Sequence, residues 1–98
     1  MKWYRKSAEQ GNARGQCNYG YCLEQGIGIG KNVEEAVKWY RKSAERGNAQ
    51  GQCNYGRCLE FGIGIAKNTE EALKWFEKSA EQGNSLAREM LDKERKNL

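Results

Sequence analysis

Length, composition and charge restrict this chain to one small domain. Of its 98 residues, 31% are charged and 38% are hydrophobic, which is ordinary for a globular protein in water. The net charge of +4 arises from interspersed acids and bases, whereas a nucleic-acid-binding protein would need clustered Lys and Arg. No apolar run approaches the roughly 18 residues of a membrane span. We therefore expect neither a nucleic acid nor a membrane as a partner.

The sequence repeats itself with a period of 36 residues, which is the spacing of Trp3, Trp39 and Trp75 (75 − 39 = 36). When residues 3–38 are aligned with 39–74, seven of the 36 position pairs differ and 29 are identical (36 − 7 = 29). A period of this length predicts a stacked array of small units, none of which can bury its apolar face alone. Such arrays present surfaces more often than they perform chemistry.

In chain order, the period divides one domain, residues 1–98, into four parts. Residues 1–12 match the end of a unit, and residues 13–48 and 49–84 are two full units. Residues 85–98 begin a third unit and then become polar, as the closing element of a repeat array requires.

Each full unit contains signals for two helices. In the second unit, Gly47 suits the end of the preceding helix, and Asn48 suits the cap of the next one. We predict a first helix, called helix A, over 49–61, and a second, called helix B, from Thr69 to about Gln82. Asn68 is the expected cap of helix B, with Glu71 in the place of a capping-box carboxylate. Each unit is therefore expected to be an αα-hairpin.

Apolar and small residues mark the expected contacts between these helices. Helix B carries one buried stripe of Ala72, Leu73, Phe76 and Ala80. The buried side of helix A in the first unit consists of Gln16, Tyr19, Gly20 and Leu23. An isolated Gly inside a helix is costly, so Gly20 and Gly56 are expected where two helices approach closely.

The motifs of the second unit resemble those of the Sel1-like repeat family. They are Tyr55-Gly56, Leu59, Gly62-Ile63-Gly64-Ile65, Glu71-Ala72-Leu73-Lys74-Trp75-Phe76 and Gly83. The resemblance covers residues 3–84. This chain has Tyr55 where the family usually has Leu, and Leu59 where the family usually has Tyr. It implies an all-α fold, a right-handed α-solenoid related to tetratricopeptide arrays, in which the helix A layer lines the concave surface. It also implies a scaffold or adaptor for protein complexes.

Four cysteines leave two interpretations open. Cys17 and Cys22, like Cys53 and Cys58, lie five residues apart, about 140° around a helix, so a pair cannot bind one metal ion together. Either all four are small, half-buried thiols between neighbouring helices, or a cross-repeat bridge joins Cys17 to Cys58 or Cys22 to Cys53. A secreted branch of the resembled family pairs a helix B cysteine with the following helix A, and this chain has Ala8, Ala44 and Ala80 there. With no signal peptide at Met1, we expect a cytoplasmic protein.

Two further motifs have structural and functional interpretations. The glycine-rich stretch 26–31 could be compared with a phosphate-binding loop, but that motif follows a strand, and a helix is expected here. We expect a tight turn whose Ile side chains plug the hairpin. The periodic tryptophans could stack on a ligand, but a packing spine is the favoured interpretation.

The positions that differ between the two units point to a binding surface. The pairs Arg14/Gln50, Tyr21/Arg57 and Gln25/Phe61 fall within about 40° on one side of helix A, together with an Asn in each unit. The predicted binding residues on this concave face are Arg14, Asn18, Tyr21, Gln25, Gln50, Asn54, Arg57 and Phe61. The alternative is neutral drift on a solvated surface.

These observations favour a non-catalytic scaffold that binds a protein or peptide on the helix A layer. Without His, a nucleophile–base pair or a metal set, we expect neither enzymatic activity nor a cofactor. One alternative is a purely structural segment of a larger protein that associates end to end through Trp3 and Tyr4. Another is RNA recognition by helical repeats, which the single Arg per unit on this surface disfavours.

Overall fold

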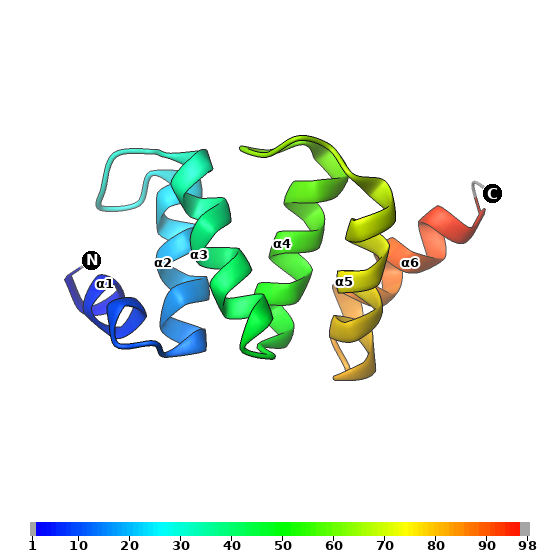
Figure 1. The fold of residues 1–98 in the computed structure, drawn as a ribbon, viewed down its shortest axis with the longest axis horizontal. Coiled ribbons are helices and arrows are strands. Elements are labelled where there is room, and N and C mark those ends of the chain that lie inside the picture. The colour runs from blue at the N-terminus through cyan, green and yellow to red at the C-terminus, as the bar shows by residue number, and fades with distance from the viewer. Residues whose placement is uncertain (1, 97–98) are drawn as a thin grey trace.

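The computed structural model describes residues 2–96, except for the side chains of residues 2–4 and 95. Within that range the chain forms six helices and no strand: α1 (Lys2–Glu9), α2 (Ala13–Gln25), α3 (Val33–Glu45), α4 (Ala49–Phe61), α5 (Thr69–Glu81) and α6 (Ser85–Lys96). The helices succeed one another along the 43 Å long axis (Figure 1). None of these six helices is long and apolar enough to cross a membrane. The expected all-α repeat architecture is confirmed.

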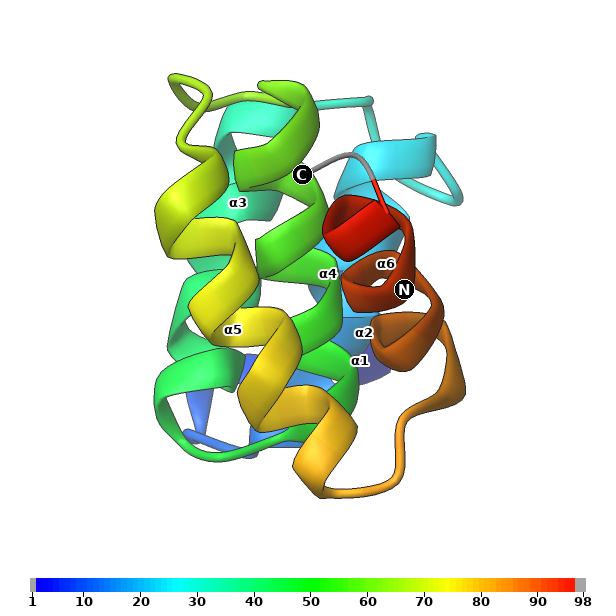
Figure 2. The ribbon, with the colours of Figure 1, turned by 90° about the vertical axis from the view of Figure 1, so that its right-hand side faces the viewer.

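The helices form two layers, which Figure 2 shows end on. The first helices of the units, α2, α4 and α6, lie on one side, and α3 and α5 lie on the other. Within a unit, α2 packs against α3, and α4 against α5. Between units, α4 packs against α3 and also touches α2. Each unit is therefore an αα-hairpin that buries its apolar side against the next, as the 36-residue period predicts.

Asparagine caps and left-handed glycines set the helix ends. The side chains of Asn12, Asn32, Asn48, Asn68 and Asn84 each accept a hydrogen bond from a backbone N–H three residues later. Gly26 and Gly62 end α2 and α4 with φ of 72° and 69°, a conformation that favours glycine. The helix bounds predicted for the second unit are confirmed, with Gln82 as the residue after the end of α5. The capping box at Glu71 is not formed, because the backbone N–H of Asn68 donates instead to Leu59 O at 2.8 Å.

The core runs between the two layers and is densely packed. Tyr40 and Phe76 are fully buried, and each faces a glycine of helix A. A Cβ atom on Gly20 would lie 2.9 Å from the Tyr40 ring, and one on Gly56 would lie 2.8 Å from the Phe76 ring. These glycines therefore allow close helix–helix approach, as expected. The predicted buried stripe of helix B is also confirmed, with Leu73 half-buried at its edge.

The tryptophan spine and the loop isoleucines complete the core. Trp39 and Trp75 pack edge-on against Tyr19 and Tyr55, with ring centroids 5.3 and 5.5 Å apart. The packing interpretation is therefore confirmed for these two, while the side chain of Trp3 lies outside the described residues. Among the loop residues, Ile29, Ile63 and Ile65 pack against the core. Ile27 is 50% exposed, so the prediction that it plugs the hairpin is wrong.

Candidate partner-binding face

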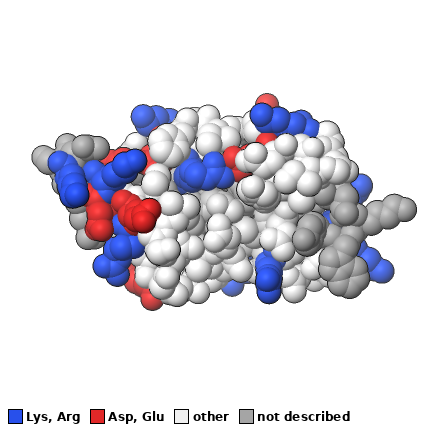
Figure 3. Space-filling view, turned by 180° about the vertical axis from the view of Figure 1, so that it is seen from behind, with Lys and Arg blue, Asp and Glu red and all other residues white. Residues whose placement is uncertain are grey.

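The side of the molecule formed by the exposed surfaces of α2, α4 and α6, called here the helix A face, is largely uncharged over its centre (Figure 3). Charged side chains gather at one end of it. The face also carries three exposed large apolar side chains, one on each helix: Tyr21 is 48% exposed, Phe61 61% and Leu86 44%. They lie at different levels, with Leu86 in the first turn of α6, Tyr21 in the second half of α2 and Phe61 at the last residue of α4. Apolar surface on one side of successive repeats is a feature of surfaces that bind a partner.

The structure places the eight predicted residues on this layer with unequal exposure. Five are exposed, namely Arg14, Tyr21, Gln25, Gln50 and Phe61. Asn18 and Arg57 are half-buried, and Asn54 is buried. The layer therefore brings the set together, but it does not leave all eight side chains available to a partner.

The expectation that both asparagines project from a solvated surface is wrong for Asn54. It is 6% exposed, and its Nδ2 atom donates to Cys17 Sγ on α2 at 3.4 Å. Its Oδ1 atom accepts from Gln50 Nε2, also at 3.4 Å. The physical reason is the contact between α4 and α2, which encloses the side chain of Asn54. Asn18 has no such helix beside it among residues 2–96 and remains half-buried.

Arg57 is held in an ion pair that the sequence analysis missed. Its guanidinium group donates to both carboxylate oxygens of Glu24, at 2.6 and 2.9 Å, and Tyr40 Oη donates to Glu24 Oε1 at 2.7 Å. Burial acts to raise the pKa of Glu24, but the hydrogen bonds from Arg57 and Tyr40 outweigh it and lower this pKa below its ordinary value. Glu24 is thus a charged, buried carboxylate that ties α2 to α3 and α4.

Glu24 and its counterpart Glu60, 36 residues later, are the functional candidates that sequence reasoning overlooked. Both are buried, at 7% and 8% exposure. The sequence does carry a signal for them, because an acidic residue directly follows the buried Leu23 and Leu59 in both units. Acids are seldom buried without a partner, so identical placement in two units indicates a structural or binding role.

The four cysteines are free thiols, and no cross-repeat bridge is present. All four are buried, more deeply than the half-buried state expected from the sequence. Burial raises the pKa of Cys17 to about 11 and that of Cys58 to about 12, which disfavours the nucleophilic thiolate. No group of three or more metal-ligating side chains is found among the described residues.

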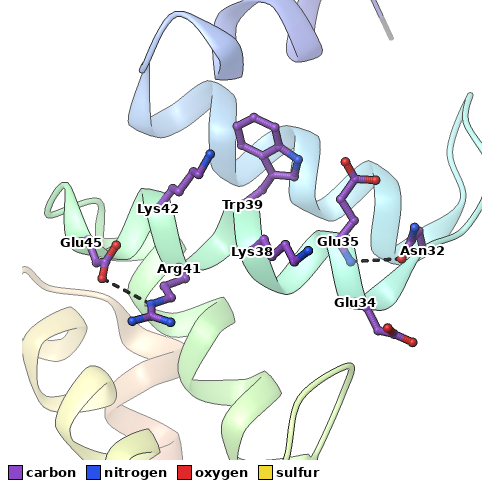
Figure 4. A pocket seen from close by; sticks show the side chains of 8 residues that line it. All are labelled: Asn32, Glu34, Glu35, Lys38, Trp39, Arg41, Lys42 and Glu45. Carbon is purple, nitrogen blue, oxygen red and sulfur yellow. Dashed lines mark hydrogen bonds and ion pairs between the residues drawn. The ribbon is translucent and has the colours of Figure 1, made fainter.

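A hollow lies on the opposite layer, along α3 (Figure 4). It is lined by charged side chains and by Trp39, and the ammonium group of Lys42 lies 4.6 Å from that ring's centroid. A matching hollow on α5 has Lys78 4.7 Å from the Trp75 centroid. In both hollows the aromatic surface already contacts a cation of the same chain. None of the eight predicted residues lines either hollow.

Two layers of αα-hairpins in a 36-residue repeat define the protein as a right-handed α-solenoid. The chain belongs to the Sel1 repeat family, whose family model matches residues 1–12, 13–48 and 49–84. Proteins of this family generally mediate protein–protein interactions, and most are non-catalytic scaffolds. A search of curated proteins found no match for the chain.

Solved structures of repeat proteins share the fold. A Sel1 repeat protein from Oxalobacter formigenes is 37% identical, with a TM-score of 0.90 over 94% of this chain and 69% of that one. The protective antigen c5321 of uropathogenic Escherichia coli is 40% identical, with a TM-score of 0.87 over 92% of this chain, which spans 19% of that protein. Helicobacter pylori cysteine rich protein B is 27% identical, with a TM-score of 0.85 over 92% of this chain and 68% of that one.

Proposed function

We propose that this chain is a non-catalytic scaffold that binds a peptide or a segment of another protein on its helix A face. The observation that carries the proposal is that each of three neighbouring helices of this layer exposes one large apolar side chain, namely Tyr21, Phe61 and Leu86. A partner that covers these side chains removes apolar surface from water, and aromatic residues are frequent anchors of protein interfaces. Exposed Gln25 and Gln50 on the same layer supply side-chain amides that can bond to a peptide backbone.

The chemistry of the chain supports a binding role rather than catalysis. His, the usual general base, is absent, and burial raises the pKa values of the Cys17 and Cys58 thiols far above neutrality, which disfavours either as a nucleophile. Free thiols are also compatible with the reducing cytoplasm, which we propose as the compartment.

Site-specific photo-crosslinking in cells tests the proposed face. A benzophenone amino acid is placed at Gln25 or Gln50 on the helix A face, and at Lys38 or Lys74 on the opposite layer as a control. We expect a discrete partner to be crosslinked from the first two positions and not from the control positions. Aromatic hot spots carry much of the binding free energy of an interface. The double change Tyr21→Ala and Phe61→Ala should therefore remove the crosslinked product, and Phe61→Ala alone should cost about 2 kcal/mol of binding free energy.

The opposite labelling pattern would contradict the proposal. If the control positions crosslink a partner and the helix A positions do not, the interface lies on the α3 and α5 layer. If the only product is a dimer of this chain, end-to-end or lateral self-association replaces partner binding. Circular dichroism of the double variant must match the original chain, so that unfolding does not account for the loss.

A further inference from the structure

Glu60, near the end of α4, is a buried acid without a complete set of partners. It is 8% exposed, and its Oε2 atom is buried without a hydrogen-bond partner among the described residues. A buried carboxylate oxygen in this state is costly, and such a group calls for an explanation. The next residue along α4, Phe61, is the most exposed of the large apolar side chains.

The repeat itself shows what a carboxylate at this position binds. Glu24 occupies the same place one unit earlier, and it accepts two hydrogen bonds from Arg57 and one from Tyr40. For Glu60, the residue that corresponds to Tyr40 is Phe76 (40 + 36 = 76), which has no hydroxyl group. The residue that corresponds to Arg57 is Lys93 (57 + 36 = 93), which is exposed and forms no ion pair with Glu60 among the described residues. The second unit therefore has no tyrosine donor, and its lysine does not take the place of the arginine.

A second acid, Glu94 on α6, raises the pKa of Glu60. Burial and then the hydrogen-bonding and charge of Glu94 on α6 raise the pKa of Glu60 to about 7, while Lys67 and Lys93 act weakly in the opposite direction. Two neighbouring carboxyl groups share a proton because both cannot be charged cheaply. A cation placed between them relieves that conflict.

We propose that Glu60 and Glu94 form a subsite for the guanidinium group of an arginine side chain in the bound partner. The proposal rests on the proposed function of the helix A face and names the chemistry of one partner residue. Because Glu60 is buried, the half-buried side chain of Glu94 in the last turn of α6 has to move for a partner to reach the carboxyl group of Glu60. The guanidinium group then replaces the shared proton and donates to Glu60 as Arg57 donates to Glu24.

Arginine fits this subsite better than lysine or a metal ion. Its planar fork donates to both oxygens of one carboxylate, which is the geometry that Arg57 and Glu24 show in the same fold. Lys93, a lysine already at the corresponding position, does not make this contact. Two carboxylates alone are too few ligands for a calcium or zinc site.

Three peptides test the subsite on the intact chain. The probes are Ac-Gly-Leu-X-Leu-Gly-NH2, in which X is arginine, citrulline or lysine, and carbon-detected NMR follows the side-chain carboxyl signals of Glu60 and Glu94. We expect the arginine peptide to shift both signals and to bind about tenfold more tightly than the citrulline peptide. Glu60→Gln should abolish that difference, whereas Glu45→Gln, on an exposed acid of α3, should keep it. Equal binding of arginine and citrulline, no shift at Glu60, or equal binding of lysine would overturn the proposal.

Lys93→Arg supplies an internal ligand and a second, independent test. It should fill the subsite from within the chain, lower the pH at which Glu60 titrates, and reduce binding of the arginine peptide to that of citrulline. If neither quantity changes, the carboxyl pair is no guanidinium subsite. The titration of Glu60 needs no cellular partner, whereas the crosslinking experiment does and depends on Tyr21 and Phe61. A negative result for the subsite can therefore be told apart from a negative result for the proposed function.

Discussion

Arg57 of α4 donates two hydrogen bonds to the carboxylate of Glu24 on α2, across 33 residues of sequence (57 − 24 = 33). The Glu24 side chain is 8% exposed and that of Arg57 25%, so solvent screens this pair less than a surface pair. Tyr40 completes the network from the other layer. Arg57 differs from the corresponding residue of the first unit, Tyr21, which makes it a candidate for specificity. It also holds the two adjacent repeats together.

Arg57→Ala should destabilise the protein by about 2 kcal/mol, because it leaves the Glu24 carboxylate buried with a single donor. Chemical denaturation at pH 7 measures the loss. Since the pKa of Glu24 is lowered in the fold, the contribution of the pair is present above about pH 4.5 and disappears as pH falls through the folded pKa. Arg14→Ala, at an exposed position on α2, is the control and should change stability by less than about 0.5 kcal/mol.

Glu60→Gln should have the opposite effect and stabilise the protein by roughly 2 kcal/mol at pH 8. The pKa of Glu60 is raised from 4.5 to about 7, so the folded state binds more protons than the unfolded state between these values. Stability therefore falls as pH rises across that window, and the amide removes the dependence. Thermal melts at pH 5 and pH 8 give the comparison. Glu24→Gln is the matched substitution and should destabilise at pH 8; loss of stability in both variants would refute the assignment.

Asn54→Ala should cost about 1 kcal/mol of folding stability, because its side-chain amide is buried in hydrogen bonds to Cys17 and Gln50. Asn18→Ala, at the corresponding position of the first unit, should be nearly neutral, because that side chain is half-buried. Urea denaturation of both variants tests the difference. Equal costs would mean that the contact between α2 and α4 does not enclose Asn54 in solution.

Gly56→Leu should be severely destabilising, since even a Cβ atom at this position would lie 2.8 Å from the Phe76 ring. Overpacking of this kind typically costs about 1–3 kcal/mol, which is a large share of the stability of a short repeat array. Gly30→Ala is the control, because nothing lies within 4 Å of the added atom and the second unit has Ala66 there. Circular dichroism melts of the two variants should therefore diverge clearly.

All four thiols should be reduced in freshly purified protein. A disulfide-exchange reagent should count four after denaturation and should react slowly before it, because the thiols are buried and the pKa of Cys17 is about 11. Gln10→Cys, at an exposed position, adds a thiol that should react at once. A count of two or none in the denatured original chain would restore the cross-repeat disulfide and indicate an oxidising compartment.

The candidate face illustrates how far the repeat pattern alone could go. Helical periodicity correctly grouped Tyr21, Gln25 and Phe61 on one exposed side of helix A. It could not distinguish Asn54 from Asn18, because the two have the same local sequence and differ only in the helix beside them. It also placed Glu24 and Glu60 at equivalent positions, but only the packing of the helices shows that Arg57 and Tyr40 donate to Glu24.

The sequence by itself determined the 36-residue unit, the bounds of α4 and α5, and the asparagine caps of the helices. These features depend on interactions within a few residues, such as Asn48 accepting from Gly51 N–H at 2.8 Å, and local sequence carries that information. Only the tertiary structure decided which polar side chains are available to a partner. Packing of α4 on α2 and α3 brings together Glu24, Tyr40 and Arg57 from three helices, and burial then sets their charge and exposure.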